Sequence, residues 1–200
     1  LVRSALDRAP GHGEALRIAR QMLHLPSTRV DVAALFSRVV ASPEGSVGEE
    51  LLPSLLRETR GMPELEGVRA AWYGHWIERL SGDPARALSV AVEAAEELPA
   101  ETVLWEAAER LARRAEDPKA VADAYARALA RADSPLLGET VGRRFVEFHE
   151  EWFDAPDVAL RLLERVLEIS PRARWALDRI KLSYNADSRW EELFALYDRA

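Results

Sequence analysis

The segment 83–128 reads DPARALSVAVEAAEELPAETVLWEAAERLARRAEDPKAVADAYARA. It contains the dipeptide Asp-Pro twice, at Asp83-Pro84 and Asp117-Pro118, 34 residues apart (117 − 83). An aspartate can cap the first turn of a helix, and a proline that follows it has no N–H to leave unpaired there. Each dipeptide therefore predicts a helix start, and the interval between them indicates a repeated unit.

The apolar residues behind these two helix starts share one spacing, which occurs twice more along the chain. Small or apolar side chains stand at positions i, i+4 and i+7, which lie on one face of a helix. The four sets are Ala87, Ala91 and Ala94; Val121, Tyr125 and Ala128; Ala159, Leu163 and Val166; and Leu193, Tyr197 and Ala200. Their first members are 34, 38 and 34 residues apart (121 − 87, 159 − 121 and 193 − 159). Because four residues make about one helical turn, the longer interval predicts a lengthened helix near 135–153.

The whole chain is predicted to be helical, because Ala, Leu, Arg and Glu are abundant and strand-forming residues are a minority. Apolar periodicity and helix-breaking residues place helices near 1–8, 13–24, 30–41, 46–60, 63–80, 84–97, 101–115, 118–132, 135–153, 156–169, 172–186 and 189–200. The short links between them favour antiparallel neighbours. Ser46 and Glu49 have capping-box spacing. The interval from Val32 to Ala87 is neither one period nor two, so residues 43–62 are expected to hold an irregular or additional helix.

The chain resembles tetratricopeptide repeat proteins, whose 34-residue unit is a helical hairpin with small and aromatic residues at fixed positions. Residues that match the first helix of a unit are Leu177, Ile180 and Tyr184, and also Trp105, Ala108 and Ala112. Those that match a second helix are Leu193, Tyr197 and Ala200. A further unit near the N-terminus is formed by Leu16, Ala19 and Leu23 with Val32, Phe36 and Val39. One departure is Lys181, which stands where the family usually has a glycine.

This resemblance implies an all-α fold, a right-handed superhelix (solenoid) of antiparallel helical hairpins. It implies a single domain over residues 1–200 with five to six hairpins, clearest over 68–200, or else a fragment of a longer array. In such a fold the first helices line a concave surface, which commonly binds other proteins.

Composition argues against several classes of function. The chain has 200 residues and no cysteine, so it can hold neither disulfides nor thiolate metal sites. Its net charge of −7 argues against nucleic-acid binding, although nearly all its basic residues are arginine. No apolar run reaches the roughly 20 residues of a membrane span, and no signal-peptide pattern begins the chain. A cytoplasmic location is expected.

Catalytic motifs are missing from the sequence. The four histidines, His12, His24, His75 and His149, form no HExxH or Glu-x-x-His pattern, and no glycine-rich phosphate loop is present. We therefore expect no enzymatic activity, no metal and no cofactor.

The resemblance assigns a partner-binding groove to one face of the first helices. Its residues are Arg69, Trp72, Trp76, Arg79, Val103, Glu106, Arg110, Arg113, Arg114, Arg144, Phe148, Trp152, Trp175, Asp178 and Leu182. Guanidinium groups bind carboxylates and indole rings supply contact area, so this surface suits a peptide with acidic and apolar side chains. The predicted function is a non-catalytic scaffold that binds a peptide or a partner helix in this groove.

Other interpretations stay open. The aromatic residues can pack between hairpins, and the arginines at 110, 113 and 114 can pair with Glu106, Glu109 and Glu116 along their own helix. The array can also be structural, as a homodimer or a part of a longer solenoid. A scaffold of the half-repeat type that serves RNA processing is a third alternative.

Overall fold

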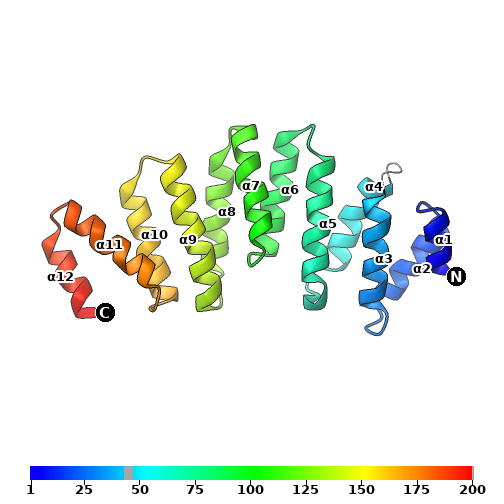
Figure 1. The fold of residues 1–200 in the computed structure, drawn as a ribbon, viewed down its shortest axis with the longest axis horizontal. Helices are drawn as coiled ribbons and strands as arrows, with labels where there is room; N and C mark the ends of the chain where they lie inside the picture. Colours follow the sequence, from blue (N-terminus) through cyan, green and yellow to red (C-terminus); the bar gives the residue numbers. More distant parts are fainter. Residues whose placement is uncertain (43–46, 200) are drawn as a thin grey trace. The chain divides into compact units, whose positions relative to one another are not determined.

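The protein is all helical throughout the part described by its computed structural model, residues 1–42 and 47–199. The helices are α1 (Val2–Arg8), α2 (Gly13–Leu23), α3 (Arg29–Ala41), α4 (Val47–Glu58), α5 (Glu66–Arg79), α6 (Pro84–Glu97), α7 (Thr102–Ala115), α8 (Pro118–Ala130), α9 (Pro135–Trp152), α10 (Pro156–Ile169), α11 (Arg174–Ala186) and α12 (Trp190–Arg199), with a short 3₁₀ helix, η1 (Pro63–Leu65) (Figure 1). The predicted all-α class is confirmed for these residues. None of the helices described is long and apolar enough to cross a membrane.

The predicted helix starts are formed by side-chain caps. The carboxylate of Asp83 accepts a hydrogen bond from the backbone N–H of Arg86, and Asp117 accepts one from Ala120. The Ser134 hydroxyl caps α9 in the same way. These bonds satisfy N–H groups that the first turn of a helix leaves unpaired. The capping box expected at Ser46 lies outside the described residues.

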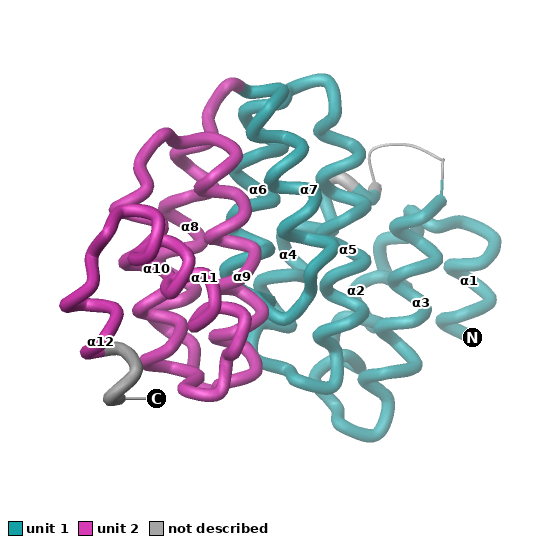
Figure 2. Tube along the Cα trace, turned by 60° about the vertical axis from the view of Figure 1, so that its left-hand side comes forward, with its two compact units in different colours: residues 1–115 teal, residues 116–200 magenta. Residues whose placement is uncertain are grey.

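The chain divides into two compact units, residues 1–115 and 116–200, which are coloured separately in Figure 2. In the first unit each helix packs against the next, and α3 and α7 also pack against α5. Figure 1 shows α3, α5 and α7 side by side. α2 and α3, which hold the residues of the N-terminal unit expected from the sequence, pack against each other, and α3 also contacts α1, α4 and α5. The additional helix expected within 43–62 is α4, which packs against both α3 and α5.

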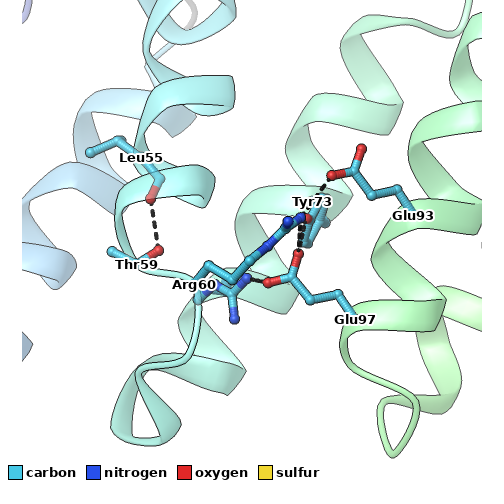
Figure 3. A network of polar contacts seen from close by, with 7 residues as sticks. Leu55, Thr59, Arg60, Tyr73, Glu93 and Glu97 are labelled. Carbon is cyan, nitrogen blue, oxygen red and sulfur yellow. Dashed lines mark hydrogen bonds and ion pairs between the residues drawn. The ribbon is translucent and has the colours of Figure 1, made fainter. Parts of the chain in front are cut away.

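A buried ion pair joins α5 to α6 inside the first unit. The guanidinium of Arg69, only 2% exposed, contacts the carboxylate of Glu97. Tyr73 and Arg60 donate hydrogen bonds to the same carboxylate, at 2.7 and 2.9 Å, as Figure 3 shows. Burial lowers the pKa of Arg69 and raises the pKa of Tyr73. Because a buried charge is costly when it lacks its partner, Arg69 and Glu97 fix how α5 lies on α6.

Replacing Arg69 by Met should lower the free energy of unfolding by about 3 kcal/mol, because the largely covered carboxylate of Glu97 then loses its closest cation. Replacing the exposed Arg60 by Met should lower it by less than about 1 kcal/mol, since surface pairs contribute little. Urea unfolding followed by circular dichroism measures both. Equal losses for the two variants would show that Arg69 and Glu97 do not form the dominant pair.

The second unit contains α8 to α12, packed in chain order, and its longest helix is α9. α9 has 18 residues where α7 has 14, which is the lengthening expected from the 38-residue interval. Gly138 and Gly142 of α9 face α10 at close range: a Cβ at Gly142 would lie 2.2 Å from Cγ2 of Val166. The two helices can approach this closely because these positions lack side chains.

His149 lies near the end of α9 and is 6% exposed. Its ring packs against Phe145 and Phe153, with centroids 6.4 and 5.0 Å away. The buried Nδ1 atom has no hydrogen-bond partner in the described part of the chain. Burial lowers the pKa of His149, although the nearby carboxylate of Glu150 opposes this. The imidazole is therefore neutral at neutral pH.

Acid should destabilise the fold through His149. The unfolded chain binds a proton at His149 near pH 6.5, whereas the folded chain binds it only at lower pH, so stability falls as the pH drops below 6.5. This contribution is at most about 1.4 kcal/mol between pH 7.5 and 5.5, the limit for a folded imidazole that takes up no proton in that range. Urea unfolding at both pH values should show a smaller decrease in the free energy of unfolding on acidification for His149→Leu than for the wild type. The exposed control His24→Gln should show the same decrease as the wild type. An unchanged decrease in His149→Leu would contradict the assignment.

Candidate peptide-binding groove

A groove lies between α5 and α7 in the first unit and has a volume of about 410 Å³. We call it the α5/α7 groove. α5 supplies mainly small residues and α7 supplies larger ones. The lining residues are Gly67, Ala70, Ala71, Gly74, Ile77 and Glu78 from α5, and Glu101, Val103, Leu104, Ala107 and Arg110 from the start of α7 onward. Most of the lining is apolar, and its charged groups are Glu78, Glu101 and Arg110.

The small residues of α5 keep the floor of this groove open. Gly67, Ala70 or Ala71, and Gly74 recur at helical spacing and so share one face of α5. A Cβ built at Gly67 or Gly74 meets no atom within 4 Å. These glycines therefore serve no close contact within the chain, unlike Gly138 and Gly142 in α9. Another molecule can approach the α5 backbone closely along this face.

α7 presents the predicted groove residues to solvent. Val103 is 58% exposed at one end of the groove, and Arg110 is exposed toward the other end. Within the described residues the Arg110 guanidinium forms no hydrogen bond or ion pair. Glu106, Arg113 and Arg114 are exposed on the same helix, and Arg114 donates a hydrogen bond to the carbonyl of Ser81. The structure thus brings Val103 and Arg110 into one hollow with α5.

The residues predicted from α5 lie on a different face of that helix. Trp72 is fully buried and its indole N–H donates to the Ser37 hydroxyl of α3, at 2.9 Å. Arg79 donates to the carbonyls of Val40 and Ser42, at 2.8 and 3.2 Å. Trp72 is buried against α3, and Arg69 is buried in its ion pair with Glu97 of α6. Both are core residues, so their assignment to a binding surface was wrong. Trp76 is half-buried and stacks on Tyr73.

In the second unit, Arg144 and Phe148, two of the residues predicted from α9, lie against α8. Arg144 donates to the Tyr125 hydroxyl of α8, at 3.3 Å, and Phe148 is buried against the same ring. Phe148 is therefore not a surface residue either. Trp152 is half-buried beside Phe148. Arg144 and Phe148 both contact Tyr125 of α8, whereas the assignment of the partly exposed Arg144 and Trp152 to a binding surface stays a prediction.

The side of α9 that meets α11 consists of residues that the sequence analysis missed. Trp175 of α11 donates to Glu139, at 2.9 Å, and lies under the guanidinium of Arg143. Arg179 donates to Glu150, at 2.5 and 2.6 Å. Asp178 and Leu182 are exposed on α11, as the groove prediction requires. Gly138 and Gly142 are the sequence signal that could have oriented α9, because glycines one turn apart often mark a close helix contact.

Metal-binding chemistry finds no support in the described residues, among which no group of three or more His, Asp or Glu side chains could hold an ion. The expected absence of catalysis and of cofactors stays a prediction. Comparison with known proteins adds no family, because no protein-family model and no curated protein matches the chain.

The two kinds of glycine should respond oppositely to alanine. Gly74→Ala should raise the free energy of unfolding by about 0.5–1 kcal/mol, because the added Cβ meets open space and glycine is a poor helix former. Gly142→Ala should lower it by about 1–3 kcal/mol, because the Cβ overlaps Val166. Thermal and urea unfolding test this contrast. A destabilised Gly74→Ala variant would mean that the floor of the groove is not open.

Proposed function

We propose that this protein is a non-catalytic interaction scaffold of the tetratricopeptide-like class, whose hairpin arrays form right-handed superhelices. Its α5/α7 groove binds a peptide or a helix of a partner protein. The observation that carries the proposal is the open face of α5, where two glycines and two alanines leave a hollow that no side chain of the described residues fills. No packing contact among the described residues requires this face of α5 to be open, whereas the binding of a partner does.

The chemistry of the groove indicates what the partner presents. Apolar floor residues such as Ala70 and Leu104 favour small or medium apolar side chains, whose burial removes apolar area from water. The unpaired guanidinium of Arg110 favours a carboxylate at that end, because charge-assisted hydrogen bonds are the stronger ones. The exposed side chain of Val103 offers apolar contact area at the other end. These features agree with a partner segment that carries apolar and acidic residues.

Self-association is a second candidate, supported by a separate observation. Trp190 and Phe194 lie one turn apart on α12 and are both exposed, Phe194 by 64%. Exposed large apolar residues on one helix face can meet a second copy or a further hairpin. Light scattering over a range of protein concentrations distinguishes this candidate, because Trp190→Ser with Phe194→Ser should abolish any concentration-dependent growth in mass.

The scaffold proposal is tested by selecting binders from a displayed library of random 12-residue peptides. Gly74→Leu should weaken the binding of the selected peptides at least about tenfold, because the leucine side chain fills the groove while leucine is a good helix former. Arg110→Glu should weaken those that carry an acidic residue. Isothermal calorimetry with purified variants measures the affinities.

Ser89→Leu is the matched control, since Ser89 is exposed on α6 and does not line the groove. It should leave the affinities unchanged within about twofold. Melting temperatures of all three variants should match that of the wild type to within a few degrees. If the selected peptides bind Gly74→Leu as tightly as the wild type, the groove is not the binding site.

A further inference from the structure

A second hollow lies wholly within the second unit, at the end of the lengthened helix α9. It has a volume of about 410 Å³ and is bounded by the last turn of α9, the link to α10, the first turns of α10, and α11. Apolar side chains form most of its wall, among them Phe153, Leu160, Leu163 and Leu182. We call it the His149 cavity. Its volume is within the range of small-molecule sites, about 300–1,000 Å³.

The cavity lies at the end of the helix that the 38-residue interval predicted to be lengthened. α9 is four residues longer than α7, and the cavity is lined by residues of its last turns, including His149 and Glu150. The link that follows reads Asp154-Ala155-Pro156, whereas in α6 and α8 an aspartate stands directly before the first proline of the helix. Ala155 is therefore the N-cap residue of α10, with no side-chain cap. Asp154 is left without the capping role that Asp83 and Asp117 have.

His149 lines this cavity and contains an unsatisfied polar atom. Its side chain is more than nine-tenths buried, lines the hollow, and leaves Nδ1 without a hydrogen-bond partner among the residues described. Buried polar groups in proteins are nearly always paired with protein, water or ligand. An apolar hollow beside an unpaired imidazole is the usual composition of a ligand site, where a few polar groups fix the orientation of an apolar body.

The charges at the rim favour a cation. Arg179 and Glu150 line the hollow and neutralise each other through their ion pair. The Asp154 carboxylate lines it too, and forms no hydrogen bond or ion pair in the described ranges 1–42 and 47–199. The neutral His149 adds no charge. The C-terminal end of α9 adds partial negative charge at the same place, and the N-terminal end of α10 adds partial positive charge, so the two helix ends offset each other and Asp154 decides the sign.

We propose that the His149 cavity binds an apolar group that bears a cationic head, with the apolar body against Leu160 and Leu163 and the cation at Asp154. The same chemistry is offered by a free aromatic amine and by an aromatic residue next to a lysine in a partner segment. This site lies outside the α5/α7 groove and does not depend on the function proposed for it.

The test uses the full chain and three indole probes of similar size: tryptamine, which is cationic, 3-methylindole, which is neutral, and indole-3-propionate, which is anionic. Binding is followed by NMR through the ring signals of His149 and the amide signal of Phe153. Tryptamine should bind with a dissociation constant of about 1 mM or lower and should shift both signals. Indole-3-propionate should bind at least about tenfold more weakly.

Two variants locate the site. Asp154→Asn should weaken tryptamine at least about fivefold and leave 3-methylindole unchanged, whereas the control Asp133→Asn, exposed in the link before α9, should change neither. Ser183→Trp places a large side chain in the cavity from α11 and should abolish the binding of both probes. The half-buried position of Ser183 allows this variant to fold, which its melting temperature checks.

A peptide arm distinguishes the two sources of the ligand. Acetyl-Gly-Trp-Lys-Gly-amide should bind more tightly than tryptamine if the natural occupant is a segment of a partner, and more weakly if it is a free amine. The proposal is overturned if indole-3-propionate binds as well as tryptamine. It is also overturned if Ser183→Trp keeps the wild-type response, or if millimolar tryptamine leaves the His149 signals unmoved.

Discussion

An amphipathic helix leaves an apolar face uncovered until another helix packs on it, and this constraint organises both units of the protein. In the first unit α5 is covered by α3, α4, α6 and part of α7. Trp72, Tyr73 and the buried pair of Arg69 and Glu97 use the faces that these helices cover. What remains of α5 is the face of small residues, and that face is the floor of the α5/α7 groove. The candidate site is therefore the face of α5 that packing within the first unit leaves uncovered.

Glycine has two different uses in this chain. In α9, Gly138 and Gly142 let α10 approach until an added Cβ would overlap Ile169 or Val166. In α5, Gly67 and Gly74 face open space. The first use stabilises the fold through close packing, whereas the second lowers helix stability without any internal contact to offset it. The open face of α5 therefore supports the proposed binding of a partner segment in the α5/α7 groove.

The sequence was sufficient to predict the helical class, the capped starts at Asp83 and Asp117, the lengthened helix α9 and the exposed face of α7. These features are local, because capping and helical periodicity depend on residues within one or two turns. The faces of α5 and α9 could not be predicted in the same way. α5 is apolar on several sides, and only its contact with α3, more than 20 residues earlier in the chain, decides that Trp72 is buried. Arg69 has no local sign of burial, because its partner Glu97 lies on the next helix. In α9, the extra helical turn interrupts the 34-residue spacing, and that spacing was the basis for assigning Arg144, Phe148 and Trp152 to the binding surface.

Site-specific photocrosslinking tests the central claim most directly, namely that the α5/α7 groove faces a partner. A benzophenone amino acid placed at Val103, which lines the groove, or at Ser89, which does not, is irradiated in a native lysate. The account predicts one discrete crosslinked species from position 103, absent from position 89 and lost when Gly74 is replaced by Leu. Crosslinking of equal yield from both positions, or from position 89 alone, would contradict it.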